Sequence, residues 1–121
     1  MSNSKEQVRL PAKWLDEMKR LWFEKEPDRI KALMANEFCY YEDPLTETPI
    51  RKIEDLVLVW QEIRFQTIEW INIDIIYQTD TVAVARWAFK QKGHPESVGC
   101  YFLEVDRFGK CVSFRQWWNT R

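Results

Sequence analysis

Residues 68–119 read IEWINIDIIYQTDTVAVARWAFKQKGHPESVGCYFLEVDRFGKCVSFRQWWN, and this stretch decides the fold. Short polar or glycine-containing breaks divide it at 79–81, 93–96 and 107–109. Runs rich in β-branched and aromatic residues that are joined by short turns are typical of antiparallel hairpins. The sequence therefore predicts four long strands in succession, at Ile68–Gln78, Val82–Lys92, Ser97–Asp106 and Lys110–Asn119.

The first half of the chain has helical periodicity instead. Apolar residues recur at spacings of three and four over residues 11–25 and again over Lys52–Arg64, which predicts two amphipathic helices. A short helix is expected after Asp28, ending near Asn36, and a strand at Phe38–Glu42. Helices gathered before a run of strands indicate an α+β fold. We expect a cone in which three N-terminal helices pack on the concave face of a curved, mainly antiparallel sheet.

The chain has 121 residues, which is room for one domain with one core. We expect residues 1–121 to form a single domain, with residues 1–10 as a mobile N-terminal tail. Seven Trp, seven Phe and four Tyr are many large rings for this length. Two interpretations stay open, because these rings either line a cavity or fill a dense core.

The charge pattern bears on the class of partner. Eighteen basic and nineteen acidic side chains nearly balance, and no basic surface for nucleic acid is indicated. No apolar run is long enough to predict a membrane span, and the polar N-terminus lacks an apolar signal region, so a cytoplasmic location is expected. Cys39, Cys100 and Cys111 lack metal-type spacing and read as reduced, mostly buried residues. We expect neither a metal nor a cofactor.

Asp43 is the candidate for chemistry. It follows an aromatic strand and precedes Pro44, at the point where the strand is expected to meet a loop. Apolar walls raise the pKa of a buried carboxyl, which suits it to act as a general base. The alternative interpretation is structural, because an aspartate before a proline commonly caps a turn through its own backbone.

Three motifs resemble the nuclear transport factor 2-like superfamily, in particular its ketosteroid isomerases and SnoaL-like polyketide cyclases. They are Glu42-Asp43-Pro44, the loop Thr48-Pro49-Ile50-Arg51, and the entry to the last strand at 108–115. The order of elements is similar over nearly the whole chain. The resemblance implies that Asp43 is the proton-shuttling base. The isomerase oxyanion donors correspond to Lys19 and Tyr101, of which Tyr101 can still donate a hydrogen bond to a carbonyl oxygen.

Alternation along the strands, combined with this resemblance, predicts the pocket. Side chains two residues apart share a face of a strand, so an inward Asp43 places Tyr41 and Cys39 inside as well. Catalytic roles are assigned to Asp43 and Tyr101. The expected ligand-binding residues are Met18, Trp22, Tyr41, Trp60, Trp87, Phe89, Leu103, Phe114, Gln116 and Trp118.

The same alternation points Phe102, Arg115 and Trp117 outward, and Glu42 is expected in solvent or at an interface. An exposed aromatic patch of this kind predicts a homodimer joined through the outer face of the sheet.

Two functions remain as hypotheses. The first is proton transfer next to a carbonyl, of the isomerase, cyclase or dehydratase type, on a small apolar molecule with Asp43 as base. The second is a non-catalytic dimeric module that binds a hydrophobic ligand or a protein partner.

Overall fold

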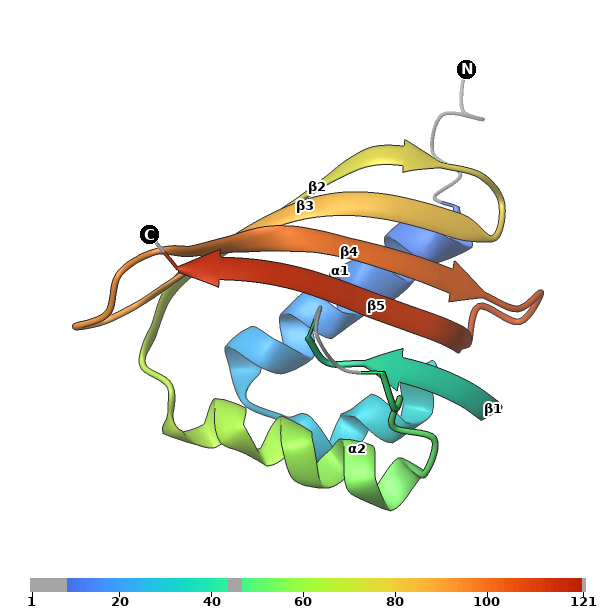
Figure 1. Cartoon of the computed structure of the whole chain (residues 1–121), viewed down its shortest axis with the longest axis horizontal. Coiled ribbons are helices and arrows are strands. Elements are labelled where there is room, and N and C mark those ends of the chain that lie inside the picture. Colours follow the sequence, from blue (N-terminus) through green and yellow to red (C-terminus); the bar gives the residue numbers. More distant parts are fainter. Residues whose placement is uncertain (1–8, 44–46, 121) are drawn as a thin grey trace.

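A computed structural model describes residues 9–43 and 47–120. Its five strands form one sheet in the order β1-β5-β4-β3-β2 (Figure 1). Strands β2 to β5 pair antiparallel with their neighbours in sequence, and β1 pairs parallel with β5. The predicted α+β fold is confirmed. The strands are β1 Met34–Tyr41, β2 Ile68–Gln78, β3 Val82–Gln91, β4 Ser97–Val105 and β5 Cys111–Thr120.

Three helical segments are confirmed, with changed bounds. The first, α1, spans Leu10–Glu24 and ends at Lys25, whose left-handed φ of 60° turns the chain. The expected mobile tail, residues 1–10, mostly lies outside the described residues, and Leu10 belongs to α1. The third segment is an α-helix, α2, only over Ile53–Trp60 and continues as the 3-10 turn η3 over Gln61–Phe65.

The second helix differs most from the prediction. It is the 3-10 helix η2, Pro27–Leu33, and it does not extend to Asn36. Strand β1 begins at once, because Met34 pairs with Cys111 of β5. Pairing with β5 therefore overrides the weak helical pattern beyond Leu33.

Helix α1 passes behind the sheet in Figure 1. Helix α2 lies below β1 in the same view, so that β1 is drawn between α2 and β5. The inward faces of α1 and the strands form one core around Phe114, which is completely buried. Burying a ring of this size stabilises the fold by roughly 2–3 kcal/mol relative to exposure. The helices therefore close the concave side of the sheet.

Alternation predicted the inner face of the antiparallel strands correctly. Ala83, Ala85, Trp87 and Phe89 of β3 are buried, as are Tyr101, Leu103 and Val105 of β4. The prediction for β1 is wrong. Phe38 and Tyr40 are its buried side chains, whereas Cys39 and Tyr41 belong to the opposite face. The strand ends at Tyr41, so its alternation does not continue to Asp43.

The three cysteines are free, but they are not equally buried. Cys111 is buried and Cys39 is half-buried, whereas Cys100 is exposed on the outer face of β4, contrary to the expectation that the cysteines are mostly buried. No helix in the described part of the chain is long and apolar enough to cross a membrane.

Candidate functional site

Two adjoining hollows lie between the helices and the concave face of the sheet. The first, called here the inner cavity, has a volume of about 120 Å³, and the second, the outer chamber, about 410 Å³. Five residues line both, so the chamber leads toward the cavity. These shared residues are Trp22, Glu62, Gln66, Tyr101 and Gln116.

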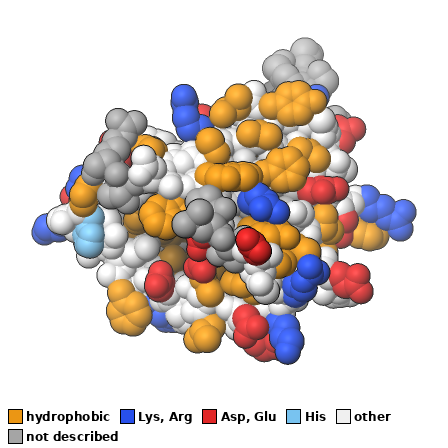
Figure 2. Space-filling view, viewed as in Figure 1, with side chains coloured by type: hydrophobic (Ala, Val, Ile, Leu, Met, Phe, Trp, Pro, Cys, Tyr) orange, Lys and Arg blue, Asp and Glu red, His pale blue; other side chains and the backbone are white. Residues whose placement is uncertain are grey.

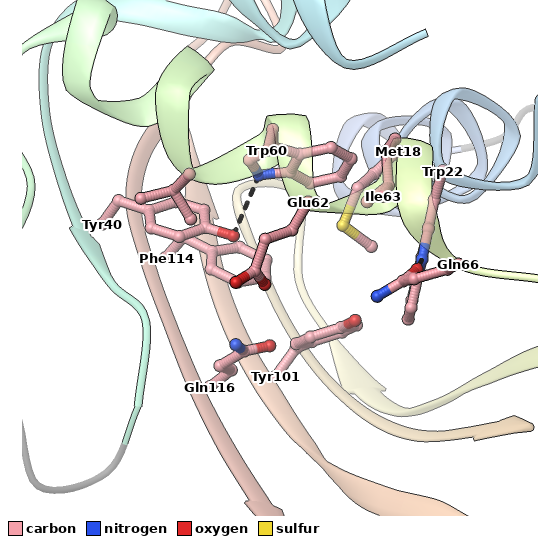
Figure 3. A pocket seen from close by; sticks show the side chains of 11 residues that line it. Met18, Trp22, Tyr40, Trp60, Glu62, Ile63, Gln66, Tyr101, Phe114 and Gln116 are labelled. Atoms are coloured by element: carbon pink, nitrogen blue, oxygen red, sulfur yellow. Dashed lines mark hydrogen bonds between the residues drawn. The ribbon is translucent and has the colours of Figure 1, made fainter. Parts of the chain in front are cut away.

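Aromatic and aliphatic side chains line the inner cavity together with the polar groups of Glu62, Gln66 and Gln116 (Figure 3). Trp60 of α2 donates a hydrogen bond from Nε1 to the hydroxyl oxygen of Tyr40, at 3.2 Å. The Tyr40 ring stacks on Phe114 with centroids 4.8 Å apart. This contact fixes α2 over β1. Burial raises the pKa of Tyr40, which keeps its hydroxyl neutral.

A second contact joins α1 to the turn that follows α2. Trp22 Nε1 donates to Gln66 Oε1 at 2.8 Å, and the Trp22 ring lies 4.7 Å from that of Phe89. The indole therefore forms a wall between the cavity and the chamber, and its polar edge is satisfied within the protein.

Tyr101 is the polar group at the centre of the site. Its side chain is only 3% exposed and packs against Trp87 and Phe114. Burial raises its pKa, so the phenol stays protonated. Figure 3 shows the hydroxyl pointing into the hollow between Gln66 and Gln116. A phenol hydroxyl can both donate a hydrogen bond to a ligand in the hollow and accept one from it.

The Trp87 ring packs closely against the backbone of β4 at Gly99. A Cβ atom at Gly99 would overlap the carbonyl oxygen of Trp117 and lie 2.7 Å from ring atoms of Trp87. Glycine is therefore required opposite this indole. The Trp87 Nε1 atom is buried and has no hydrogen-bond partner in the structure.

Three carboxyl groups line the outer chamber, from Glu42, Asp43 and Glu62. Gln116 donates from Nε2 to the backbone oxygen of Glu42 at 2.5 Å, which fixes the chain beyond β1. Burial raises the pKa of Glu42, and the nearby charges of Glu62 and Asp43 raise it further. Glu42 is therefore not the solvated residue that the sequence suggested.

Most of the predicted site residues come together in these hollows. Asp43 and Tyr101 line the same chamber, as expected. Among the expected ligand-binding residues, Met18, Trp22, Trp60, Phe114 and Gln116 line the inner cavity, and Trp87, Phe89 and Trp118 line the chamber.

Two predicted pocket residues lie elsewhere. Leu103 points inward but is completely buried in the core and lines neither hollow. Tyr41 packs under the guanidinium of Arg115, whose Cζ is 3.7 Å from the ring centroid, on the outer face. Tyr41 therefore does not line the pocket, because Phe38 and Tyr40 are the side chains that β1 buries beside it.

Sequence reasoning missed Glu62 and Gln66, which line both hollows. A signal for them exists, because Val59, Glu62, Ile63 and Gln66 follow at helical spacing and all line the inner cavity. The polarity of Glu62 and Gln66 hides this face, because polar side chains on a helix are usually expected in solvent.

Neither a protein-family model nor a curated protein matches the sequence. Solved structures do match. A steroid delta-isomerase from Pseudomonas aeruginosa aligns with a TM-score of 0.72 at 14% identity, over 94% of this chain and 82% of that chain. A putative polyketide cyclase from Xanthomonas campestris pv. campestris gives 0.68 at 11% identity, over 91% and 90%.

A third structure is a hypothetical protein from Catenulispora acidiphila with a ketosteroid isomerase-like fold, in complex with trimethylamine. It aligns with a TM-score of 0.65 at 14% identity, over 85% of this chain and 82% of that chain. The chain has the nuclear transport factor 2-like fold. In this cone the hollows described above occupy the space between sheet and helices.

No group of three or more His, Cys, Asp or Glu side chains among the described residues could hold a metal ion. A carboxylate can accept a proton in the chamber, and the Tyr101 hydroxyl can donate a hydrogen bond there.

The raised pKa of Glu42 predicts the sign of a stability change. Ionising Glu42 costs more in the folded than in the unfolded state, so its contribution to stability is complete below about pH 4 and is lost as pH rises through the folded pKa. Glu42→Gln should raise the free energy of unfolding near neutral pH by up to about 1 kcal/mol, since the carboxyl is only partly buried.

Urea unfolding at several pH values measures this effect, with Glu37→Gln as the control because Glu37 is exposed on β1. The Glu42→Gln gain should shrink as the pH is lowered toward 4, an approximate limit set by the ordinary pKa of glutamate. A gain that stays constant with pH, or a loss near neutrality, contradicts this account.

Proposed function

We propose that the chain binds a small molecule with an apolar body in the outer chamber and the adjoining inner cavity. One observation carries the proposal, namely that ring side chains line a hollow into which the Tyr101 hydroxyl points. The volume of about 410 Å³ is in the range of small-molecule pockets, which combine apolar walls with a few orienting polar groups. The complex of a protein of the same fold with trimethylamine supports this use of the cone.

Filling the chamber tests the proposal. Ser97 lines the chamber, whereas Glu69 is exposed on β2 and lines neither hollow. Ser97→Trp should abolish saturable binding of a fluorescent apolar probe, and Glu69→Trp should leave its affinity within about twofold, since surface substitutions away from a site are usually close to neutral. Equal binding by both variants, or no saturable binding by the unmodified chain, contradicts the proposal.

A second candidate function is proton transfer next to a carbonyl, of the isomerase, cyclase or dehydratase type, with Asp43 as base. It is supported by Asp43 and Tyr101 lining one chamber, where a base and a neutral hydrogen-bond donor can act on the same substrate. Glu42 is the alternative base, since burial raises its pKa above the ordinary value of a glutamate. The non-catalytic binding module remains the other interpretation of the same chamber.

Exchange of deuterium into the α-position of a small ketone, followed by NMR, tests this candidate. Asp43→Asn should reduce exchange at least about a hundredfold if Asp43 is the base, because a positioned base contributes about 10²–10⁴-fold. Glu42→Gln removes the neighbouring carboxylate in the same way. The variant that loses more of the exchange rate identifies the residue that acts as base. Should Asp43 only cap the turn, Asp43→Ala will cost about 1 kcal/mol of stability and leave exchange unchanged. Absence of exchange in the unmodified chain leaves binding as the function.

We further propose a homodimer joined through the outer face of the sheet. Trp117 is 42% exposed there, and the Arg115 guanidinium lies between its ring and that of Tyr41. Figure 2 shows hydrophobic side chains gathered over this face.

Free cysteines fit a reducing compartment, which supports a cytoplasmic location.

Trp117→Glu should convert the dimer to a monomer in sedimentation experiments at tens of micromolar, on the order of ordinary association constants. Trp118→Glu is the matched control, because Trp118 belongs to the opposite face of β5 and lines the chamber. An unmodified chain that sediments as a monomer contradicts the dimer.

A further inference from the structure

The charged side chains that line the outer chamber are acidic, whereas acidic and basic side chains nearly balance over the whole chain. Three of its lining residues, Glu42, Asp43 and Glu62, are acidic, and no Lys, Arg or His is among the described residues that line it. Over the whole chain, 18 basic side chains nearly balance 19 acidic ones. The potential in the chamber is therefore negative, with Glu42 and Asp43 half-buried and Glu62 exposed to solvent.

These acidic side chains are brought together by the fold. Glu42 and Asp43 directly follow β1, whereas Glu62 belongs to η3. The hydrogen bond from Gln116 to the Glu42 backbone fixes one side, and Figure 3 shows Glu62 reaching toward Gln116 from the other. Like charges so placed repel, which is one cause of the raised pKa of Glu42. A cation between them offsets the repulsion, and an anion increases it.

The walls between these charges suit an organic cation. The aromatic lining includes Trp22 against Phe89 and Trp87 against Tyr101, with centroid separations of 4.7 and 5.7 Å, and Trp118 at the exposed rim. The face of an aromatic ring is negative and attracts ammonium groups, most strongly where water is excluded. An ammonium ion with apolar substituents contacts both features of the chamber at once.

Tyr101 provides a separate indication that the hollow receives a polar ligand. Its side chain is 3% exposed, and Figure 3 shows its hydroxyl pointing into the hollow rather than into the core. As a neutral phenol it can accept a hydrogen bond from an ammonium N–H group.

A metal ion is a poorer occupant. The carboxyl groups of the described residues do not form a group of three that could hold a metal ion. Their charges instead act across a wider space, of about 410 Å³, which matches a cation spread over several heavy atoms.

We propose that the outer chamber binds an organic ammonium cation on an apolar body, with the cation among the aromatic rings and facing Glu42, Asp43 and Glu62. This inference rests on the proposed small-molecule function and names its ligand class. The apolar body extends toward the inner cavity, where Glu62 is the one charged side chain among the described residues that line it.

A pair of probes of equal shape tests the charge directly. Benzyltrimethylammonium and neopentylbenzene differ in having nitrogen or carbon at the branch point, so only the first is charged. Calorimetric titration of the full chain near neutral pH should give an affinity at least about tenfold higher for the cation, since cation–π contacts and carboxylates act together.

Charge-removing variants locate the site. Glu42→Gln and Glu62→Gln should each weaken cation binding by about threefold or more and leave neopentylbenzene unaffected, because only the charged probe interacts with the removed carboxylate. Glu69→Gln is the control, since Glu69 is exposed on β2 and lines neither hollow.

The outcomes separate this inference from the proposed function. If neopentylbenzene binds as tightly as the cation, the ammonium preference is wrong while small-molecule binding stands. If neither probe binds saturably, both proposals are overturned. A cation preference that survives both Glu42→Gln and Glu62→Gln overturns the assignment to this chamber.

Discussion

The structure depends on the aromatic packing around Phe114. This completely buried ring on β5 receives Trp14 from α1 at 5.5 Å, Tyr40 from β1 at 4.8 Å and Tyr101 from β4 at 4.9 Å, measured between ring centroids. Contacts from three directions join the first helix, the parallel strand and the hairpin strands at one point. Rings that pack on Phe114 do not also fill the neighbouring space between the helices and the sheet. The inner cavity and the outer chamber lie in that space.

The sequence was most informative where one rule governed a long segment. Strands β3 and β4 alternate between a buried and an outer face, so spacing grouped Trp87 with Phe89 on one face. The family resemblance then indicated that this face, and Tyr101 on the next strand, point inward. The prediction of the inner face of β1 was wrong for two reasons. Strand β1 pairs in parallel with β5, a partner far away in sequence, and it ends before Asp43. The pairing of Tyr40 with Phe114 of β5 decides which face of β1 points inward. The pattern of residues within β1 carries no information about that pairing.

The acidic side of the chamber was harder to predict for a related reason. Glu62 and Gln66 lie on a helical face shared with Ile63, but polarity alone assigns such residues to solvent. Only the closure of η3 over the sheet brings Glu62 near Glu42. Repulsion between these groups, and burial of Glu42, are tolerated in the fold although they work against its stability. A site that retains such unfavourable features is a candidate for function.

The most direct measurement is a crystal structure of the chain with benzyltrimethylammonium bound. The account predicts the quaternary nitrogen in the outer chamber, within about 6 Å of the centroid of at least one of the rings Trp22, Trp87, Tyr101 and Trp118. Glu42 and Glu62 should face it, and the benzyl ring should point toward the inner cavity. A cation bound on the outer face of the sheet, with the chamber closed by its own side chains, contradicts the account.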